Sequence, residues 1–340
     1  MALYWNDIRN FAGKLTLPRL WNAGKILSSY YLSRWTGKPV QWGLPFNISI
    51  EPTTTCNLGC PECPSGLKSF TRPTGNLELD LYKKVLEECK DHLIYQYFYF
   101  QGEPYMHPQF LELVKLANEH KVYSVTSTNA HFLTDRKAKE TVESGLDRII
   151  ISLDGTDQET YEQYRRQGKM DKVIEGTKRL VKWKAKLKSA TPHIILQFLV
   201  VKPNEHQIDE VKDLGIELGV DEVKLKTAQI YDYQNGSPLI PENEKYSRYA
   251  KQPDGTYKIK SAWHDHCWKL WHACVVTWDG RIVPCCFDKD ASHQMGDLRK
   301  HSLKDVWWNE DYAAFRRQVL KGRSEIDICR NCTEGLEVWG

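Results

Sequence analysis

The residues that decide the fold are FNISIEPTTTCNLGCPECPSG, residues 46–66. FNISIE reads as a strand, and Cys56, Cys60 and Cys63 follow it with the spacing C-x3-C-x2-C. Because α/β barrels and open sheets place their chemistry at the carboxyl ends of parallel strands, we expect this loop to line a functional site. Three thiolates can hold three corners of a four-iron cluster and leave the fourth iron open. The alternatives are zinc, which needs a fourth ligand, and a chance cluster of buried cysteines.

Strand-like and helix-like stretches alternate from residue 46 to residue 227. Such alternation is typical of parallel strands joined by crossover helices. Six strand–helix steps are present, with the last helix unresolved, so we predict an α/β fold: a partial (β/α)6 TIM-like barrel, open on one side. The predicted strands after the first cover residues 94–100, 122–127, 147–154, 193–201 and 220–226.

The rest of the chain divides into three parts. Residues 1–45 hold six basic residues, one acid and eight aromatics, and we expect a helical prefix that packs on the main domain. Contact with a membrane surface or a partner groove is the alternative for this basic, aromatic segment. Residues 228–262 contain Gly and Pro typical of a linker or loop. Residues 263–340 are rich in cysteine and tryptophan. A stretch this short buries too little core to be stable alone, so we expect a small auxiliary domain stabilised by a bound metal.

Composition excludes several classes of protein. Over 340 residues, 47 Lys and Arg oppose 44 Asp and Glu, a net charge of +3 that argues against a nucleic-acid binder. No apolar run approaches the roughly 18–20 residues of a membrane span, and the first residues lack a secretory signal. We therefore expect a cytoplasmic protein. Nine of its ten cysteines lie in two groups, which favours metal ligands over disulfides.

The residues CNLGCPEC resemble the motif of the radical S-adenosylmethionine (SAM) superfamily. Three further stretches agree: QGEP at 101–104, TSTNAHFL at 126–133, and the segment from Ser152 to Gly168. The chain departs from the family pattern at Glu62, where an aromatic residue is usual, and at Ala130, where the family often has glycine.

The resemblance implies a [4Fe-4S] cluster held by Cys56, Cys60 and Cys63, with SAM at its open iron. It also implies roles for residues at the strand ends. Glu103 would contact the SAM ammonium, and an asparagine side chain such as Asn129 can bridge ribose hydroxyls or the carboxylate. Ser152 would bond the ribose or carboxylate, and Arg165 would clamp the carboxylate, unless it is a solvated helix arginine. Gln197 is a further candidate near the adenosine.

The activity implied by this resemblance is reductive cleavage of SAM. The resulting 5′-deoxyadenosyl radical removes hydrogen from an unactivated C–H, while the protein positions the reactants and excludes water. Such an enzyme needs an external reductant, such as flavodoxin or ferredoxin.

The late segment resembles the SPASM/twitch extension of radical SAM enzymes, which holds auxiliary iron–sulfur clusters. The DG pair at Asp279 and Gly280 predicts a hairpin that delivers cysteines at fixed positions. The resemblance implies an auxiliary [4Fe-4S] cluster used for electron transfer. Of the six late cysteines, four would bind this cluster. Cys274 would not be a ligand unless it took the place of Cys267, and Cys286 would not be a ligand unless it took the place of Cys285. A zinc ribbon is the alternative. The implied ligands are Cys267, Cys285, Cys329 and Cys332.

A short extension with a single auxiliary cluster resembles that of radical SAM enzymes that dehydrogenate or epimerise sugar-like alcohols. We therefore expect oxidation or epimerisation of a sugar-like or lipid-linked metabolite, with Cys274 or Cys286 as catalytic hydrogen donor in the second case. A small metabolite is favoured over a peptide, because no leader-binding domain is recognisable. The alternatives are a peptide-modifying maturase and, from another class, a non-catalytic zinc-binding interaction protein.

Overall fold

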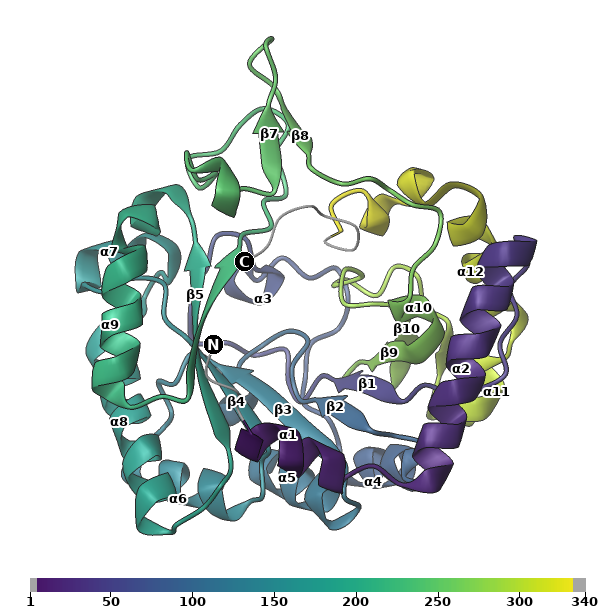
Figure 1. Ribbon diagram of the computed structural model, residues 1–340, viewed down its shortest axis with the longest axis horizontal. Coiled ribbons are helices and arrows are strands. Elements are labelled where there is room, and N and C mark those ends of the chain that lie inside the picture. Colours follow the sequence, from purple (N-terminus) through teal and green to yellow (C-terminus); the bar gives the residue numbers. More distant parts are fainter. Residues whose placement is uncertain (1–4, 333–340) are drawn as a thin grey trace.

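The computed structural model describes residues 5–332. Six parallel strands follow one another across the sheet in chain order (Figure 1). This arrangement confirms the predicted class, a partial TIM-like barrel. The strands are β1 (Asn47–Ile50), β2 (Tyr95–Tyr97), β3 (Tyr123–Thr128), β4 (Arg148–Ser152), β5 (His193–Val200) and β6 (Glu222–Thr227).

Crossover helices cover the outer face of these strands (Figure 1). Two short segments depart from a simple alternation, because β1 is followed by α3 and α4, and β4 by α7 and α8. The short helix α3 (Pro64–Leu67) belongs to the cysteine loop. The helices of the outer layer are α4 (Leu79–Cys89), α5 (Phe110–Glu119), α6 (Asp135–Glu143), α7 (Gln158–Tyr164), α8 (Met170–Lys186) and α9 (Ile208–Leu218).

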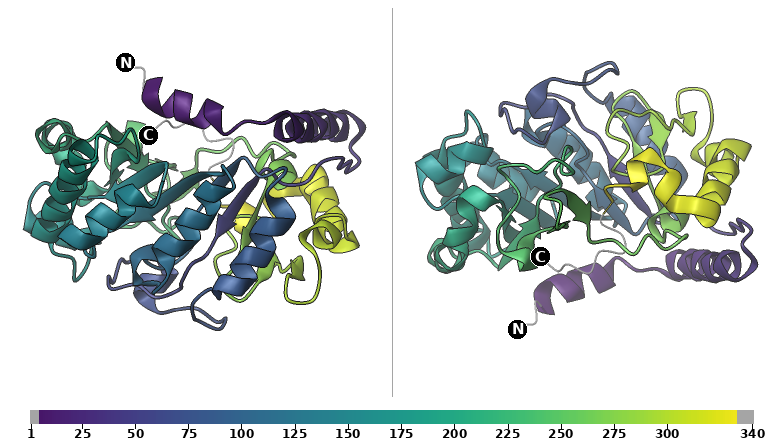
Figure 2. Two further views of the ribbon diagram at one scale, coloured as in Figure 1. Left: turned by 90° about the horizontal axis from the view of Figure 1, so that it is seen from below. Right: turned by 90° about the horizontal axis from the view of Figure 1, so that it is seen from above.

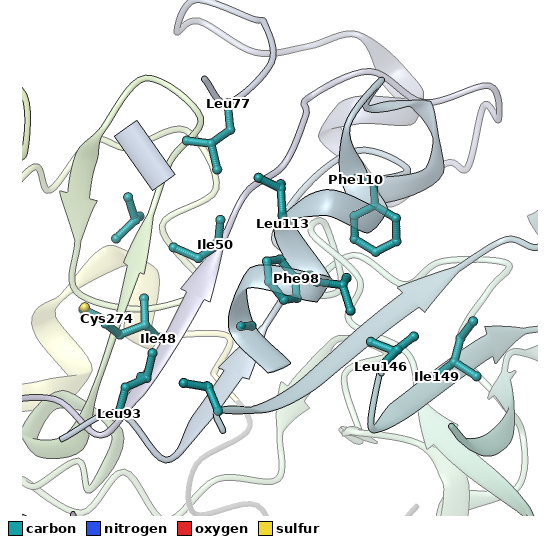
Figure 3. Packing of buried hydrophobic residues seen from close by; sticks show 14 of the residues in the cluster. Ile48, Ile50, Leu77, Leu93, Phe98, Phe110, Leu113, Leu146, Ile149 and Cys274 are labelled. Atoms are coloured by element: carbon teal, nitrogen blue, oxygen red, sulfur yellow. The ribbon is translucent and has the colours of Figure 1, made fainter. Parts of the chain in front are cut away.

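The core lies between the strands and these helices. Alternate residues of a strand point to opposite faces, so Ile48 and Ile50 of β1 face the helices, and Phe98 and Leu113 pack beside them (Figure 3). All four side chains are at most 1% exposed. Burial of each large apolar side chain contributes roughly 1.5–3 kcal/mol to the free energy of folding. This gain fixes which strand residues face the helices.

The cysteine-rich segment is continuous with the barrel sheet. Its strands are β9 (Ala273–Val276), β10 (Arg281–Val283) and β11 (Gly296–Asp297). β9 pairs in parallel with β1, so the sheet has nine strands in the order β11-β10-β9-β1-β2-β3-β4-β5-β6. The predicted hairpin is present, and Gly280 at its turn has φ +87°, which suits glycine. Pairing with β1 satisfies a strand edge that would otherwise lie open.

Helices close the remainder of the structure. α10 (Lys269–His272), α11 (Leu303–Trp307) and α12 (Glu310–Gly322) lie around the hairpin, and a second hairpin, β7 (Tyr249–Lys251) with β8 (Tyr257–Ile259), projects from the linker region (Figure 1). The prefix forms α1 (Trp5–Gly13) and α2 (Leu17–Thr36). No helix among residues 5–332 is long and apolar enough to cross a bilayer.

Helix α1 covers the amino ends of the barrel strands. Asp7 accepts hydrogen bonds from Tyr123 and Arg148, the first residues of β3 and β4. Asn10 Nδ2 donates to Asp147 Oδ1 at 2.7 Å. The barrel interior is therefore closed by α1 at the end opposite to the cysteine loop.

Candidate active site

The three early cysteines line one cavity of about 140 Å³ at the carboxyl end of the strands. Cys60 is buried, whereas Cys56 and Cys63 are half-buried. The loop is tightly packed, because a Cβ at Gly66 would lie 2.6 Å from the Cys60 nitrogen. Burial raises the pKa of the Cys56 thiol to about 12, so a thiolate there depends on a bound cation. We call this space the cysteine cavity.

A buried ion pair supports the start of the cysteine loop. Arg72 Nη1 and Nη2 donate to the two Glu51 oxygens at 2.9 and 2.6 Å, and both side chains are at most 2% exposed. The backbone N–H of Trp278 also donates to Glu51, at 3.2 Å. The residue that follows β1 is therefore fixed to the loop and to the β9–β10 turn.

Glu103 lies in the cysteine cavity on a polar framework. Its Oε1 accepts from Thr128 Oγ1 at 2.7 Å, and its Oε2 accepts from the Asn129 N–H at 2.8 Å. Burial raises its pKa, and these hydrogen bonds oppose that effect. Gly102 permits the turn, with φ +76° and no room for a Cβ, which would lie 2.2 Å from the Thr53 oxygen. A fixed, buried carboxylate of this kind suits an ammonium ligand.

Asn129 lines the same cavity directly after β3. Its Nδ2 donates to Asn57 Oδ1 in the cysteine loop at 2.8 Å. The next residue, Ala130, has φ +61°, the left-handed region that favours glycine. This conformation explains physically why glycine suits this position, and the chain tolerates alanine there.

Ser152 and Arg165 complete the cysteine cavity. Arg165 Nε donates to Asp154 Oδ2 at 2.5 Å, and its Nη1 lies 3.8 Å from Cys60 Sγ. Its side chain is only 17% exposed, so the alternative of a solvated helix arginine is wrong. The guanidinium instead places positive charge beside the thiols, where an anionic cluster or a carboxylate would be stabilised.

The structure also gathers the late cysteines. Burial raises the pKa of Cys285, and its neighbours Cys286, Cys332 and Cys267 act electrostatically in the same direction. Cys329 is similarly coupled to Cys332. Arg323 interacts with Cys267, Cys329 and Cys332, so a cation faces these thiols. The four implied auxiliary ligands therefore lie in one neighbourhood.

The two remaining late cysteines, Cys274 and Cys286, differ from each other in burial. Cys274 pairs with Ile48 in register, so its side chain points to the helix-covered face, where it is 2% exposed (Figure 3). Cys286 is exposed and acts electrostatically on Tyr99 and Lys226. Cys274 does not reach the barrel interior, which corrects the expectation that it is a hydrogen donor; Cys286 stays a prediction.

A second cavity, of about 430 Å³, occupies the inside of the barrel. It adjoins the cysteine cavity, since Gln197 in this space is the register partner of Ser152 in the other. Gln197 therefore lies in the second space rather than in the cysteine cavity. We call it the barrel cavity; its lining includes Tyr95, Tyr97, Tyr99, Arg148, Gln197, Lys224, Lys226 and Arg248.

The barrel cavity has a positive lining. Four of its residues are cationic, and none is Asp or Glu. Arg148 is paired with Asp7, and Lys224 lies 3.2 Å from Glu222. The other two cations, Lys226 and Arg248, have no carboxylate partner among the described residues. Desolvation lowers the pKa of both groups, although Lys226 is exposed to solvent whereas Arg248 is buried.

Arg248 is the most constrained of these cations. It is 6% exposed, and its Nε and Nη2 donate to the Thr227 carbonyl oxygen at 3.1 and 2.7 Å. Its Nη1 is buried without a hydrogen-bond partner within the described structure. A buried N–H donor without an acceptor destabilises the folded protein, and an anionic ligand that accepted from Nη1 would remove this destabilisation.

Comparison with known families agrees with this geometry. The sequence model of the radical SAM superfamily matches residues 50–214, and that of the iron–sulfur cluster-binding SPASM domain matches residues 267–333. The chain is therefore an iron–sulfur enzyme of the radical SAM class. More specifically, it belongs to the radical SAM superfamily members that carry a SPASM domain.

One curated protein and two solved structures illustrate what the chain is similar to. A tungsten-containing aldehyde ferredoxin oxidoreductase cofactor-modifying protein of Pyrococcus furiosus is 28% identical over 334 residues, covering 86% of this chain and 91% of the relative. Streptococcus suis SuiB, bound to its precursor peptide SuiA, has a TM-score of 0.63 at 15% identity, over 93% of this chain and 76% of SuiB. Native anSMEcpe with bound AdoMet has a TM-score of 0.60 at 16% identity, over 86% of this chain and 89% of anSMEcpe. At these identities the two structures show the fold alone.

The family defines the cofactors as a SAM-binding [4Fe-4S] cluster, an auxiliary iron–sulfur cluster and SAM. Within residues 5–332 no three His, Cys, Asp or Glu side chains converge as for a single metal ion. The fit of the cluster therefore depends on the cavity that the three early thiols share. Its lining supplies three soft ligands, a cationic Arg165, and polar groups for an amino acid, so the residues fit. The zinc alternatives are not supported.

The motifs did not reveal the barrel cavity. The sequence held one indication of this cavity. Alternation with period two places Tyr95, Tyr97 and Tyr99 on one face of their strand, and Lys224 and Lys226 on one face of theirs. Because helices cover the outer face of these strands, residues of the alternate face point into the barrel. No comparable signal marked Arg148 or Arg248, which reach the cavity through sheet register and through a loop.

Proposed function

We propose that this enzyme removes a hydrogen atom from a small anionic metabolite, sugar-like or lipid-linked, that binds in the barrel cavity. The observation that carries the proposal is the unpaired positive charge of Lys226 and Arg248 in a space adjoining the cysteine cavity. A phosphate or carboxylate group suits both donors. The name of the Pyrococcus relative, a cofactor-modifying protein, agrees with a substrate that is not a peptide.

The chain's own residues would divide the work between binding and positioning. Lys226 and Arg248 would hold the anionic end of the substrate, while three tyrosines line the wall and exclude water. Glu103, Asn129 and Arg165 would hold the amino acid end of SAM at the neighbouring cavity. The bound cluster and SAM supply the 5′-deoxyadenosyl radical. Anchoring the substrate at one end would keep the attacked C–H at a fixed distance.

The outcome depends on what happens to the substrate radical. Loss of one electron and one proton would give a dehydrogenated product, and an auxiliary cluster held by the late cysteines would supply an electron acceptor. Return of a hydrogen atom from a thiol to the opposite face gives an epimer, after which one electron and one proton regenerate the thiol. For the second route we propose Cys286 as the thiol; its exposure and its electrostatic effect on the cavity residues Tyr99 and Lys226 support this choice.

Deuterium transfer tests the substrate class. The reduced, fully reconstituted enzyme is supplied with SAM and with deuterated phosphorylated sugars, lipid-linked sugar phosphates, uncharged sugars or peptides. We expect deuterium in 5′-deoxyadenosine only with a phosphate- or carboxylate-bearing metabolite. Transfer from a peptide or from an uncharged sugar at equal rate would contradict the proposal.

Replacement of the two spare cysteines tests the outcome. With the active substrate in D2O, epimerisation incorporates one solvent deuterium into the product, whereas dehydrogenation incorporates none. We expect Cys286→Ser to abolish solvent incorporation if the product is an epimer, while Cys274→Ser leaves it unchanged. An epimer that still gains solvent deuterium in Cys286→Ser would exclude this thiol as the donor.

A further inference from the structure

We infer that helices α1 and α2 form a docking face for an anionic phospholipid surface. The inference concerns where the enzyme works, and it stands independently of which substrate the barrel cavity takes. We call this surface the helical face; its exposed apolar residues are Trp5, Ile8, Leu17, Leu20, Trp21, Leu27, Tyr31, Trp35 and Trp42.

Exposed apolar side chains are concentrated on this surface. Fourteen large hydrophobic side chains of the described residues are exposed, and nine of them lie within residues 5–42. Leu17 is 84% exposed, Trp21 72% and Trp35 85%. Scattered exposed hydrophobic residues are ordinary, whereas a concentrated patch marks an interaction surface.

The patch follows the periodicity of a helix. Leu17, Leu20, Trp21, Leu27, Tyr31 and Trp35 recur along α2 at spacings close to multiples of its turn. The opposite side of α2 is buried, including Ile26, Tyr30 and Ser33. Both α1 and α2 lie along the same side of the molecule in the two views of Figure 2. A flat surface can therefore contact both helices at once.

The charge of this surface selects the occupant. Arg9, Arg34 and Lys38 are exposed, and no Asp or Glu occurs between residues 8 and 50. Asp7 is buried and bonded to Tyr123 and Arg148. Basic residues beside tryptophan and leucine are the pattern of helices that lie in the headgroup layer of anionic bilayers. A second copy of this chain would bring the same cations together without any acid to pair them.

The helices are held rigidly in place for this contact. Arg19 is 3% exposed and donates to four carbonyl oxygens, those of Lys14, Lys90, His120 and Lys121, at 2.6–2.8 Å. Asn22 exchanges two hydrogen bonds with Leu44. Because the buried side is fixed in this way, the apolar stripe stays presented to the outside, and binding requires little ordering of the protein.

Vesicle flotation under anaerobic conditions tests the inference with the full-length holoenzyme. Vesicles contain phosphatidylcholine alone or with roughly 30 mol % phosphatidylglycerol. We expect the enzyme to float with the anionic vesicles, and this fraction to fall when salt is raised, because screening weakens headgroup attraction. Absence of binding to the anionic vesicles would overturn the inference.

Variants separate a lipid surface from other occupants. Trp21→Glu with Trp35→Glu should lower vesicle partitioning at least about tenfold, and Ile216→Glu, a change at a 78% exposed residue on α9, should have no effect. Iron content and SAM cleavage should be unchanged in all variants. Equal partitioning of both variants would overturn the inference. A wild-type dimer in sedimentation that the double variant dissociates, without vesicle binding, would assign the face to a second copy instead.

Discussion

The two cavities of this enzyme differ in how their residues are delivered. The cysteine cavity is built from the loops that follow β1, β2 and β3, with Ser152 at the end of β4 and Arg165 after α7. Short motifs such as CNLGCPEC and QGEP supply many of its groups. The barrel cavity is built mainly from side chains along the strands, together with Arg248 from a loop, and these residues belong to no motif. The first carries the chemistry shared by the superfamily, and we propose that the second gives this chain its own selectivity. The predictions below separate these two roles.

The largest effect is expected at the cysteine loop. Cys60→Ala removes one of three ligands of the SAM-binding cluster, so we expect SAM cleavage to be abolished and roughly half of the iron to be lost. The measurement is 5′-deoxyadenosine formation with dithionite, together with iron content. Cys89→Ala, a change at a fully buried cysteine of α4, is the control and should keep all the iron. Continued cleavage in Cys60→Ala would contradict the site assignment.

A smaller effect is expected from the ion pair beneath that loop. Arg72→Ala leaves Glu51 buried and unpaired, which should lower the free energy of unfolding by about 3–5 kcal/mol. Urea unfolding under anaerobic conditions measures the loss. In the control, Arg299→Ala, the pair with Glu78 is exposed, so the change should stay below about 1 kcal/mol. Similar losses in both variants would show that burial of the pair does not matter.

The smallest effect is expected where the chain departs from the family pattern. Ala130 has φ +61°, so Ala130→Gly should raise the free energy of unfolding by about 0.5–1 kcal/mol. Ala138→Gly, in the middle of α6, should lower it by about the same amount, because glycine is unfavourable inside a helix. Thermal unfolding of both variants provides the comparison. A destabilised Ala130→Gly would mean that packing of the methyl group outweighs backbone strain.

Sequence predicted the parts of this structure that depend on local patterns. Alternation of strand and helix gave six parallel strands, and cysteine spacing located both cysteine groups. Contacts between distant segments were not predictable in this way. The pairing of β9 with β1 fixes the side of the sheet on which Cys274 lies, and no local pattern encodes that register. Arg248 reaches the barrel cavity from a loop after β6, where the sequence shows only turn residues.

The prefix illustrates the same limit. Its basic and aromatic composition left packing and membrane contact as alternatives. In the structure the two are compatible, because Arg19 and Asn22 fasten one side of α2 while Trp21 and Trp35 remain exposed on the other. Which face of an amphipathic helix is buried depends on its tertiary partners, and these are visible only in the fold.

One measurement tests the division between the two cavities most directly. SAM cleavage without substrate and deuterium transfer from the labelled anionic substrate are measured in parallel for Lys226→Ala with Arg248→Lys, and for Lys251→Ala as the control. The account predicts unchanged substrate-free cleavage and at least about a tenfold higher substrate concentration for half-maximal transfer, equivalent to about 1.4 kcal/mol of binding. Equal loss of both activities, or loss of neither, would contradict it.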